Sequence, residues 1–401
     1  MLQIINLDLF ETLALAVVVL FLGMFLKKKI VFLEEYCIPS PVIGGLVIAL
    51  VNYIFYLCGY AFAFNETIED LCMVVFFTTI GLQVDLRIIK KSFLTLIILL
   101  VCVFVLIVLQ NIIALGTAYV LKGDMLNALT AGSISMMGGS GVAEIVGPVL
   151  EDFRLENGQN LAYGMCTLGF ITSALIGGPL GRYLIKKHNL KPSLEQSKDT
   201  PPKKVNTDEK ETPKLPFQAK LAKVIYRILI IMGLGMVLCD VLSVFGPVLP
   251  DYIGAMFVAI VVRNLGDITG KLPVYPVELN YIGALSLSLF LAIDFMNIAI
   301  WQLSVINVTQ IIIFVLQFIL ITAVAFFVVF RITGKDYDAA IISAASCGFG
   351  LGASSSAISN MMVLVGKYGP SIKSFLLVPI VGTLLADAMN SIVIYVILWL
   401  I

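Results

Sequence analysis

Ten apolar segments, most of them long enough to cross a lipid bilayer as a helix, run through this 401-residue chain. A span needs roughly 20 apolar residues, and within the hydrocarbon layer a helix satisfies its own backbone N–H and C=O groups. Only 13% of the residues are charged, whereas soluble domains typically have about 25%. We therefore expect an all-α polytopic membrane protein with spans near 9–26, 38–58, 67–85, 92–121, 159–181, 224–246, 251–264, 278–296, 303–331 and 371–400.

Charge and cysteine patterns exclude several other classes. The 26 basic and 26 acidic residues cancel, so no global field favours a nucleic-acid partner. The seven cysteines are scattered through apolar runs without a CxxC motif or a Cys/His pair at metal-ligand spacing. We expect no covalent cofactor, no nucleic-acid partner and a lipid bilayer as the surroundings.

A polar stretch at 186–223, rich in Lys, Glu, Asp, Pro and Thr, separates residues 1–185 from residues 224–401, with five predicted spans in each half. Its composition is typical of a solvated linker. With the N-terminus outside, 24 of the 26 basic residues fall on the cytoplasmic side, and only Lys122 and Arg154 do not. Basic residues accumulate in cytoplasmic loops, which predicts both termini outside and the linker in the cytoplasm. Because five is odd, similar halves would be inverted-topology repeats.

Each half contains one segment that is too polar and too rich in Gly and Ser for an ordinary span, at 124–148 and at 337–362. The stretch GDMLNALTAGSISMMGGSG (123–141) resembles KDYDAAIISAASCGFGLG (335–352), which supports the repeat. With five spans on either side, each segment must leave the membrane on the side from which it entered. We therefore predict two re-entrant hairpins that enter from opposite sides, in protein surroundings or a water-filled cavity that satisfies their backbone.

The hairpin tips are the predicted binding site. Glycine permits left-handed turns and close backbone approach. Helix N-termini at such tips suit a carboxylate, and exposed carbonyls suit a sodium ion. The candidate substrate-binding residues are Ser135, Gly138, Gly139, Ser140, Gly141, Gly348, Gly350, Gly352, Ser354, Ser355, Asp387 and Asn390.

Cation coupling follows from the charges inside the spans. No Lys or Arg lies well within a span, so an anionic substrate would have to be neutralised by helix N-termini, hydroxyl groups and co-bound cations. Ionisable residues at membrane depth are costly and are functional candidates by default. The candidate sodium ligands are Asp294, Ser133, Ser346 and Glu144.

Three other interpretations stay open on the residues alone. The glycines could serve only as helix-packing surfaces. Asp294 and Asp387 could be the facing aspartates of an intramembrane aspartyl protease, although GFGLGAS (348–354) lacks the usual Gly-x-Gly-Asp context. A channel would use the same segments without a discrete gated site.

Several stretches of the chain resemble the bacterial sodium/glutamate symporter family. The most specific of them is GKDYDAAIISAASCGFGLGASSSAISNM at 334–361. The others are IPSPVIGGLVIAL at 38–50, FFTTIGL at 76–82, GSISMMGGSG at 132–141, LSLSLFLAI at 285–293 and LVPIVGTLLADAMNSIVI at 377–394. The resemblance covers nearly the whole chain except the linker.

This resemblance implies uptake of L-glutamate driven by sodium across the bacterial inner membrane, without enzymatic chemistry. It also implies a homodimer of elevator type, in which a transport domain carries both hairpins. The family pattern Gly-Gly-His-Gly-Thr at the first tip is replaced here by Gly-Gly-Ser-Gly-Val, with Ser140 and Val142. A sodium-coupled carrier of another di- or tricarboxylate, such as citrate or malate, is therefore the alternative.

Overall fold

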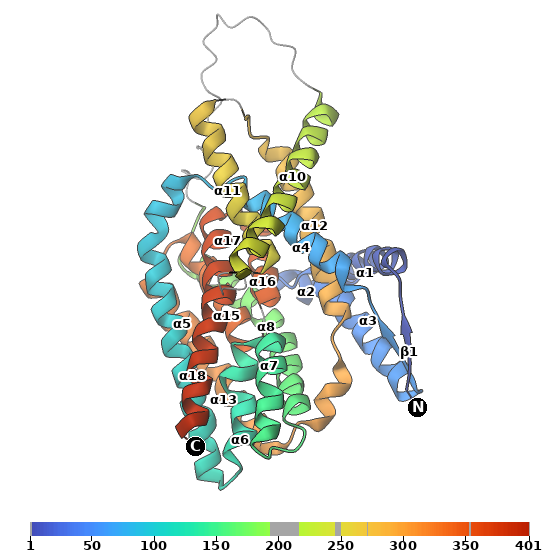
Figure 1. Ribbon diagram of the computed structural model, residues 1–401, viewed down its shortest axis with the longest axis vertical. Coiled ribbons are helices and arrows are strands. Elements are labelled where there is room, and N and C mark those ends of the chain that lie inside the picture. The colour runs from blue at the N-terminus through green and yellow to red at the C-terminus, as the bar shows by residue number, and fades with distance from the viewer. Residues whose placement is uncertain (1, 193–215, 245–249, 271, 353, 401) are drawn as a thin grey trace, which may run out of the picture.

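The computed structural model describes residues 2–192, 216–244, 250–270, 272–352 and 354–400, and it is mostly helical (Figure 1). Nine helical segments of the described chain are long and apolar enough to cross a membrane, which confirms a polytopic helical protein. These segments are α1 (Leu9–Lys29), α3 (Ser40–Leu57), Ser92–Leu121 within α5 (Leu86–Leu121), α8 (Gly158–Lys187), α10 (Phe217–Val244), α11 (Asp251–Thr269), α12 (Pro276–Met296), Val308–Ile332 and Ile372–Leu400.

Two of these membrane-length segments each combine α-helices with a π-helix. Val308–Ile332 consists of α13 (Val308–Ala323), the π-helix η3 (Val324–Val329) and α14 (Phe330–Ile332). Ile372–Leu400 consists of α17 (Ile372–Pro379), the π-helix η4 (Ile380–Leu385) and α18 (Ala386–Leu400). Pro379 is the last residue of α17, directly before η4. Because proline has no backbone N–H to donate, a departure from regular α-helix is expected there.

The predicted span at 67–85 is a shorter helix than expected. Helix α4 covers Glu66–Gly81, only 16 residues. Its N-cap is Asn65, whose side-chain oxygen accepts a hydrogen bond from the backbone N–H of Thr67 (3.0 Å). Its first turn carries Glu66 and Glu69, which the positive end of the helix dipole favours.

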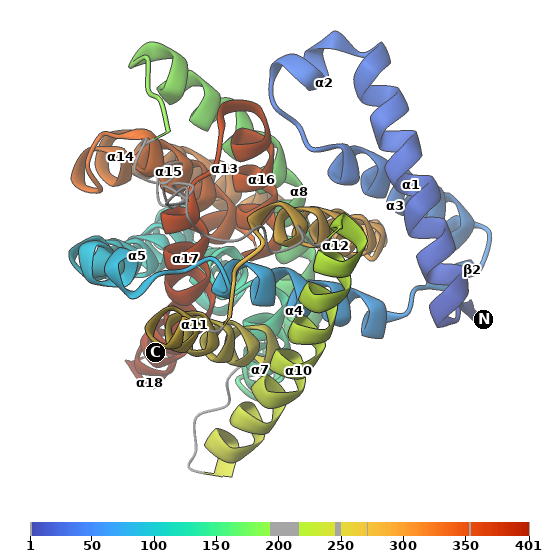
Figure 2. The same cartoon turned by 90° about the horizontal axis from the view of Figure 1, so that it is seen from above.

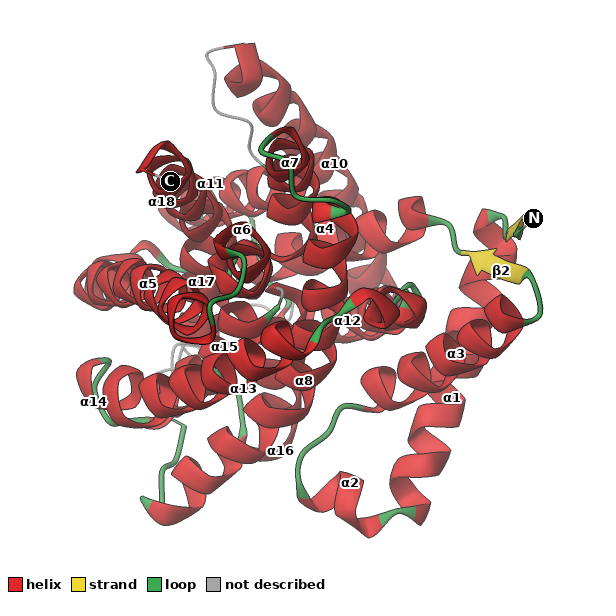
Figure 3. Cartoon of the chain, turned by 90° about the horizontal axis from the view of Figure 1, so that it is seen from below, coloured by secondary structure: helices red, strands yellow, loops and turns green. Residues whose placement is uncertain are grey.

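A pair of short parallel strands departs from the all-α expectation. Strand β1 (Gln3–Asn6), just before α1, pairs with β2 (Tyr60–Ala63), just after α3. Asn52 of α3 holds β2 in place, because its side-chain amide donates to and accepts from the backbone of Phe62 (2.9 Å each). Figure 3 shows these strands at the outer end of the unit formed by α1, α2 (Val31–Glu35) and α3.

Both Gly/Ser-rich segments form helix–turn–helix units. The first hairpin consists of α6 (Met125–Leu129), the π-helix η1 (Thr130–Ile134) and α7 (Gly139–Asp152). The second hairpin consists of α15 (Tyr337–Leu351) and α16 (Ser354–Tyr368), which pack against each other. In each, the helix breaks within the glycine cluster that the sequence indicated.

The helices pack as two groups. In Figures 1 and 2, α5 lies on one side of the molecule, α1 and α3 lie on the other, and α4 and α12 lie between them. In the first helical group (α1, α3, α4, α10, α11, α12), α4 packs on α12, α3 packs on α12, and α11 packs on α4. In the second helical group (α5 to α8 and α13 to α18), α8 packs on α7, α15 and α16, and α5 packs on α13. Aromatic pairs join the groups. Phe170 of α8 stacks on Phe295 of α12 with ring centroids 4.5 Å apart, and Phe76 of α4 meets Phe375 of α17 at 5.7 Å.

Most of the predicted linker, 186–223, lies outside the described residues. Helices extend into both ends of the linker, since α8 ends at Lys187 and α10 begins at Phe217. Within the linker, residues 193–215 lie outside the described residues.

Candidate functional site

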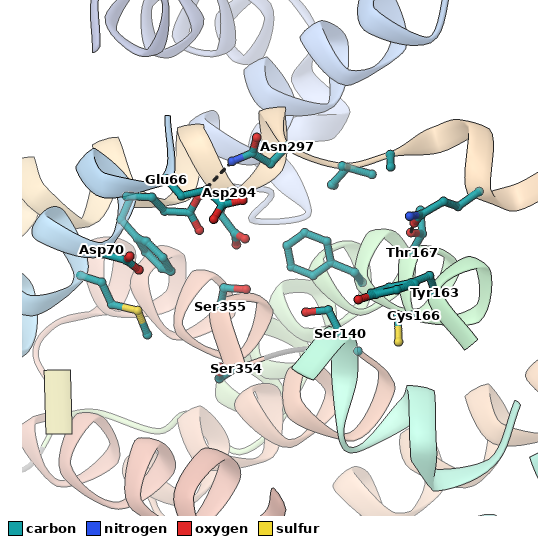
Figure 4. A pocket seen from close by; sticks show the side chains of 18 residues that line it. Glu66, Asp70, Ser140, Tyr163, Cys166, Thr167, Asp294, Asn297, Ser354 and Ser355 are labelled. Carbon is teal, nitrogen blue, oxygen red and sulfur yellow. Dashed lines mark hydrogen bonds between the residues drawn. The ribbon is translucent and has the colours of Figure 1, made fainter. Parts of the chain in front are cut away.

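The turns of both hairpins border one cavity between the two helical groups. The cavity has a volume of about 580 Å³ and is lined by Ser140 of the first hairpin and by Gly352, Ser354 and Ser355 of the second. Helices α4, α8 and α12 and residues of the segment 297–302 after α12 supply the other walls. Figure 4 shows the hairpin serines on one side of this cavity and Asp294 and Asn297 on the other. The cavity therefore joins two segments that are more than 200 residues apart in the chain.

At the first hairpin, the backbone itself creates the turn. Gly132 interrupts the helical backbone of η1 (φ −84°, ψ −146°), and Gly139, the first residue of α7, has a left-handed φ of +58°. Gly138, the N-cap of α7, offers no side-chain acceptor to the first turn. The free N–H groups and the positive end of the helix dipole therefore lie beside Ser140, at the cavity.

The second hairpin turns at Gly352, where there is no room for a side chain. A Cβ atom on Gly352 would lie 2.5 Å from the backbone nitrogen of Phe170 in α8. This close approach brings Ser354 and Ser355, in the first turn of α16, to the cavity. Helix N-termini of this kind bind carboxylates and other anions. Two of them thus face one cavity.

The opposite wall is acidic. Four carboxylates line it, Glu66, Glu69 and Asp70 from α4 and Asp294 from α12, and no Lys, Arg or His does so among the described residues. Asn297 donates a hydrogen bond to Glu69 (Nδ2 to Oε2, 3.0 Å). Asp294 lies in contact with both Glu69 and Ser355. Its Oδ2 atom is buried without a hydrogen-bond partner in the described structure.

This wall creates a demand for positive charge. Two adjacent carboxylates in a partly buried position repel each other unless a proton or a cation lies between or beside them. An unpaired buried carboxylate oxygen is costly as well. The wall therefore suits a monovalent cation or an ammonium group, while the helix N-termini across the cavity suit a carboxylate.

Five predicted site residues line the cavity: Ser140, Gly352, Ser354, Ser355 and Asp294. Other predicted residues lie behind the hairpins, as part of their support. Ser133 is enclosed by two amides, since Asn111 donates to its Oγ (2.7 Å) and Asn390 donates to its carbonyl oxygen (2.8 Å). Ser135 donates to the carbonyl oxygens of Thr130 and Ala162 (2.5 and 2.9 Å).

The remaining predicted residues do not line the cavity. Ser346 donates within α15 to the carbonyl of Ser343 (2.8 Å). At Gly348, α15 approaches the backbone of α16 closely. Gly141, Glu144 and Asp387 are exposed. Asp387, which was predicted to bind substrate, therefore does not line this cavity.

Gly350 belongs to a buried amide chain that supports the second hairpin. Gln317 of α13 donates to the carbonyl of Gln110 in α5 (2.8 Å), and Gln110 donates to the carbonyl of Gly350 (2.7 Å). Both glutamines are fully buried. Such buried polar contacts fix one geometry because each unmade hydrogen bond is costly.

Sequence reasoning missed Glu69 and Asn297. Glu69 lies near the start of the predicted span at 67–85, and Asn297 follows α12 immediately. A signal was present, because Glu66, Glu69 and Asp70 place three carboxylates within five residues of a segment otherwise fit for a membrane.

Gly139→Val is expected to abolish transport while the protein still inserts into the membrane. A non-glycine residue at left-handed φ costs roughly 1–2 kcal/mol, more for a β-branched one, and relief of this strain would displace Ser140. Gly141→Val, two residues away, is the matched control, because a Cβ there meets no atom within 4 Å. Uptake and membrane content of both variants are the measurements. Wild-type uptake by Gly139→Val would contradict the assigned role of the turn.

The chain is similar to known proteins over nearly its whole length. The family model described as sodium/glutamate symporter matches residues 5–370. A protein named sodium/glutamate symporter from Escherichia coli (strain K12) is 34% identical over 391 residues, which is 97% of either chain. One of the same name from Haemophilus influenzae is 33% identical over 387 residues, 95% of either chain.

Proposed function

The chain belongs to the sodium/glutamate symporter family, and we propose that it couples the inward flow of sodium to the uptake of L-glutamate. It is a transporter and not an enzyme, and it is a multi-pass membrane protein. The bacterial inner membrane is its proposed location. Sodium is the coupling ion and glutamate the cargo.

The observation that carries this proposal is the charge of the cavity. Four carboxylates and no basic residue line it in the described structure, so an anion that entered alone would be repelled. Glutamate brings two carboxylates and one ammonium group. The N-termini of α7 and α16 suit its carboxylates, the acidic wall suits its ammonium group, and sodium ions balance the remaining charge.

Alternating access by an elevator motion is the proposed mechanism. Both hairpins belong to the second helical group, whereas Glu69 and Asp294 belong to the first. A cavity between two such groups opens to one side or the other when one group moves past the other. The contact of Asp294 with Ser355 would then belong to one of the two end states.

Inverted repeats are part of the same proposal. The two halves pack on each other in matching pairs. Helix α3 of the first half packs on α12 of the second, and α11 of the second half packs on α4 of the first. The proposed topology keeps both termini outside and the linker in the cytoplasm, supported by the basic residues at the ends of α1 and α8. A homodimer held by the first helical group completes the proposal.

Proteoliposomes test the function directly. An inward sodium gradient is expected to drive accumulation of labelled L-glutamate, and an equal potassium gradient is expected to leave uptake at the level of protein-free liposomes. Citrate and malate serve as competitors, because Ser140 stands at the cavity where the family pattern has His. Sodium-independent uptake would contradict the coupling, and displacement of glutamate by malate or citrate would reassign the cargo.

A further inference from the structure

A second cavity lies at the C-terminal end of α8, apart from the transport site. It has a volume of about 440 Å³ and is lined by Tyr36, Pro179, Arg182, Tyr183, Lys186 and Lys187. None of these residues lines the cavity at the hairpin tips. The cavity lies between the two helical groups, because Tyr36 follows α2, which packs on α1 of the first group, and the other five residues belong to α8 of the second.

The second cavity carries uncompensated positive charge. Arg182 forms an ion pair with Glu35 (Nη2 to Oε1, 2.8 Å), and hydrogen bonding and charge from Arg182 lower the pKa of Glu35, which therefore stays ionised at neutral pH. Lys186 and Lys187 form no salt bridge with any residue that the structure describes. After the Arg182–Glu35 pair is counted, two lysine charges remain.

Arg182 brings a guanidinium group to the same cavity. The Nε atom of Arg182 is buried and has no hydrogen-bond partner among the described residues, and the side chain as a whole is only 16% exposed. Guanidinium groups pair well with phosphate oxygens through charge and hydrogen bonds. Because the Nε atom is shielded, Arg182 contributes positive charge to the cavity wall rather than an open donor.

Aromatic rings lie beside this charge. The Nζ atom of Lys187 lies 5.3 Å from the ring centroid of Tyr183 and 5.5 Å from that of Phe326, and Tyr183 is 52% exposed. Tyrosine beside lysine at the end of a membrane-spanning helix is typical of the membrane–water interface. Basic pockets between helices at this depth bind anionic headgroups.

We propose that this cavity is a binding site for the phosphate headgroup of an anionic phospholipid. Lys186 and Lys187 provide the charge, the Arg182 guanidinium adds to it, and Tyr36 and Tyr183 contact the glycerol region. Because Tyr36 follows a helix that packs on the first helical group and α8 belongs to the second, the bound lipid stabilises the arrangement in which these groups stand together. The inference does not depend on which substrate the protein carries.

Native mass spectrometry of the purified full-length protein tests the proposal. Phosphatidylglycerol is expected to bind the wild type, with phosphatidylcholine and inorganic phosphate binding much more weakly. Lys186→Gln/Lys187→Gln is expected to weaken phosphatidylglycerol binding by roughly tenfold or more, since each basic residue near a membrane surface contributes about a factor of five. Lys186→Arg/Lys187→Arg is expected to restore it. These two variants leave the Arg182–Glu35 pair intact.

Lys220→Gln/Lys223→Gln on α10 is the matched control, because it also removes two lysines near a helix end but outside the cavity. It is expected to bind phosphatidylglycerol like the wild type. Equal lipid binding by the Lys186/Lys187 glutamine variant and the wild type would overturn the proposal. Inorganic phosphate binding as tightly as the lipid would overturn it too, because the site would then be a general anion site.

Discussion

Asp294→Asn lowers the apparent affinity for sodium by roughly ten- to a hundredfold, the expected loss when a charged partner contributing about 1.5–3 kcal/mol is removed. Asp294 lies beside Glu69 and Ser355, and its Oδ2 atom is buried without a partner in the described structure. Asparagine keeps the shape of the side chain but removes the charge that attracts the cation. The measurement is the sodium concentration needed for glutamate to raise the melting temperature, repeated with uptake in proteoliposomes.

Glu66→Gln is the control for this effect. Glu66 lines the same wall but is exposed, and exposed ion pairs contribute only about 0.2–1 kcal/mol, so sodium affinity is expected to fall by less than about fivefold. Adding Glu69→Gln to Asp294→Asn tests the contact, because neighbouring residues couple by about 0.5–3 kcal/mol. Unchanged sodium affinity in Asp294→Asn would remove this residue from the cation site.

Gly169→Ala is expected to destabilise the protein and to reduce transport strongly, although alanine is the better helix former. Gly169 lies within α8, and a Cβ atom there would overlap the carbonyl oxygen of Leu351, the last residue of α15. Because the obstacle is backbone, the second hairpin must move away. Overpacking of this kind costs typically 1–3 kcal/mol. Melting temperature and glutamate uptake are the two measurements.

The same substitution at Gly366 should act in the opposite direction. Gly366 lies within α16, and a Cβ atom there meets nothing within 4 Å. Alanine is favoured over glycine in a helix interior by up to about 1 kcal/mol, so Gly366→Ala is expected to be neutral or slightly stabilising, with normal uptake. Equal melting temperatures for the two variants would show that α8 and the second hairpin leave room for a methyl group at position 169.

The sequence by itself was sufficient for the local features of this protein. The apolar runs predicted the helices, because the length of a span and the satisfaction of its backbone depend only on that segment. The glycine clusters predicted where both hairpins turn, since backbone freedom is also a local property. The two short strands were not predicted, because four-residue segments carry too little periodicity to indicate pairing with a segment more than 50 residues away.

Only the tertiary structure decided which side chains meet. In a membrane helix both the lipid-facing and the protein-facing sides are apolar, so hydropathy gives little indication of which way each helix faces. Asp294 and Asp387 therefore looked equivalent in the sequence, yet Asp294 lines the cavity and Asp387 is exposed. Ser133 and Ser140 belong to the same hairpin, but only Ser140 reaches the cavity, while Ser133 is held by Asn111 and Asn390 behind it. Helix rotation and long-range packing, which no local pattern encodes, place Glu69 of the first half against Asp294 of the second.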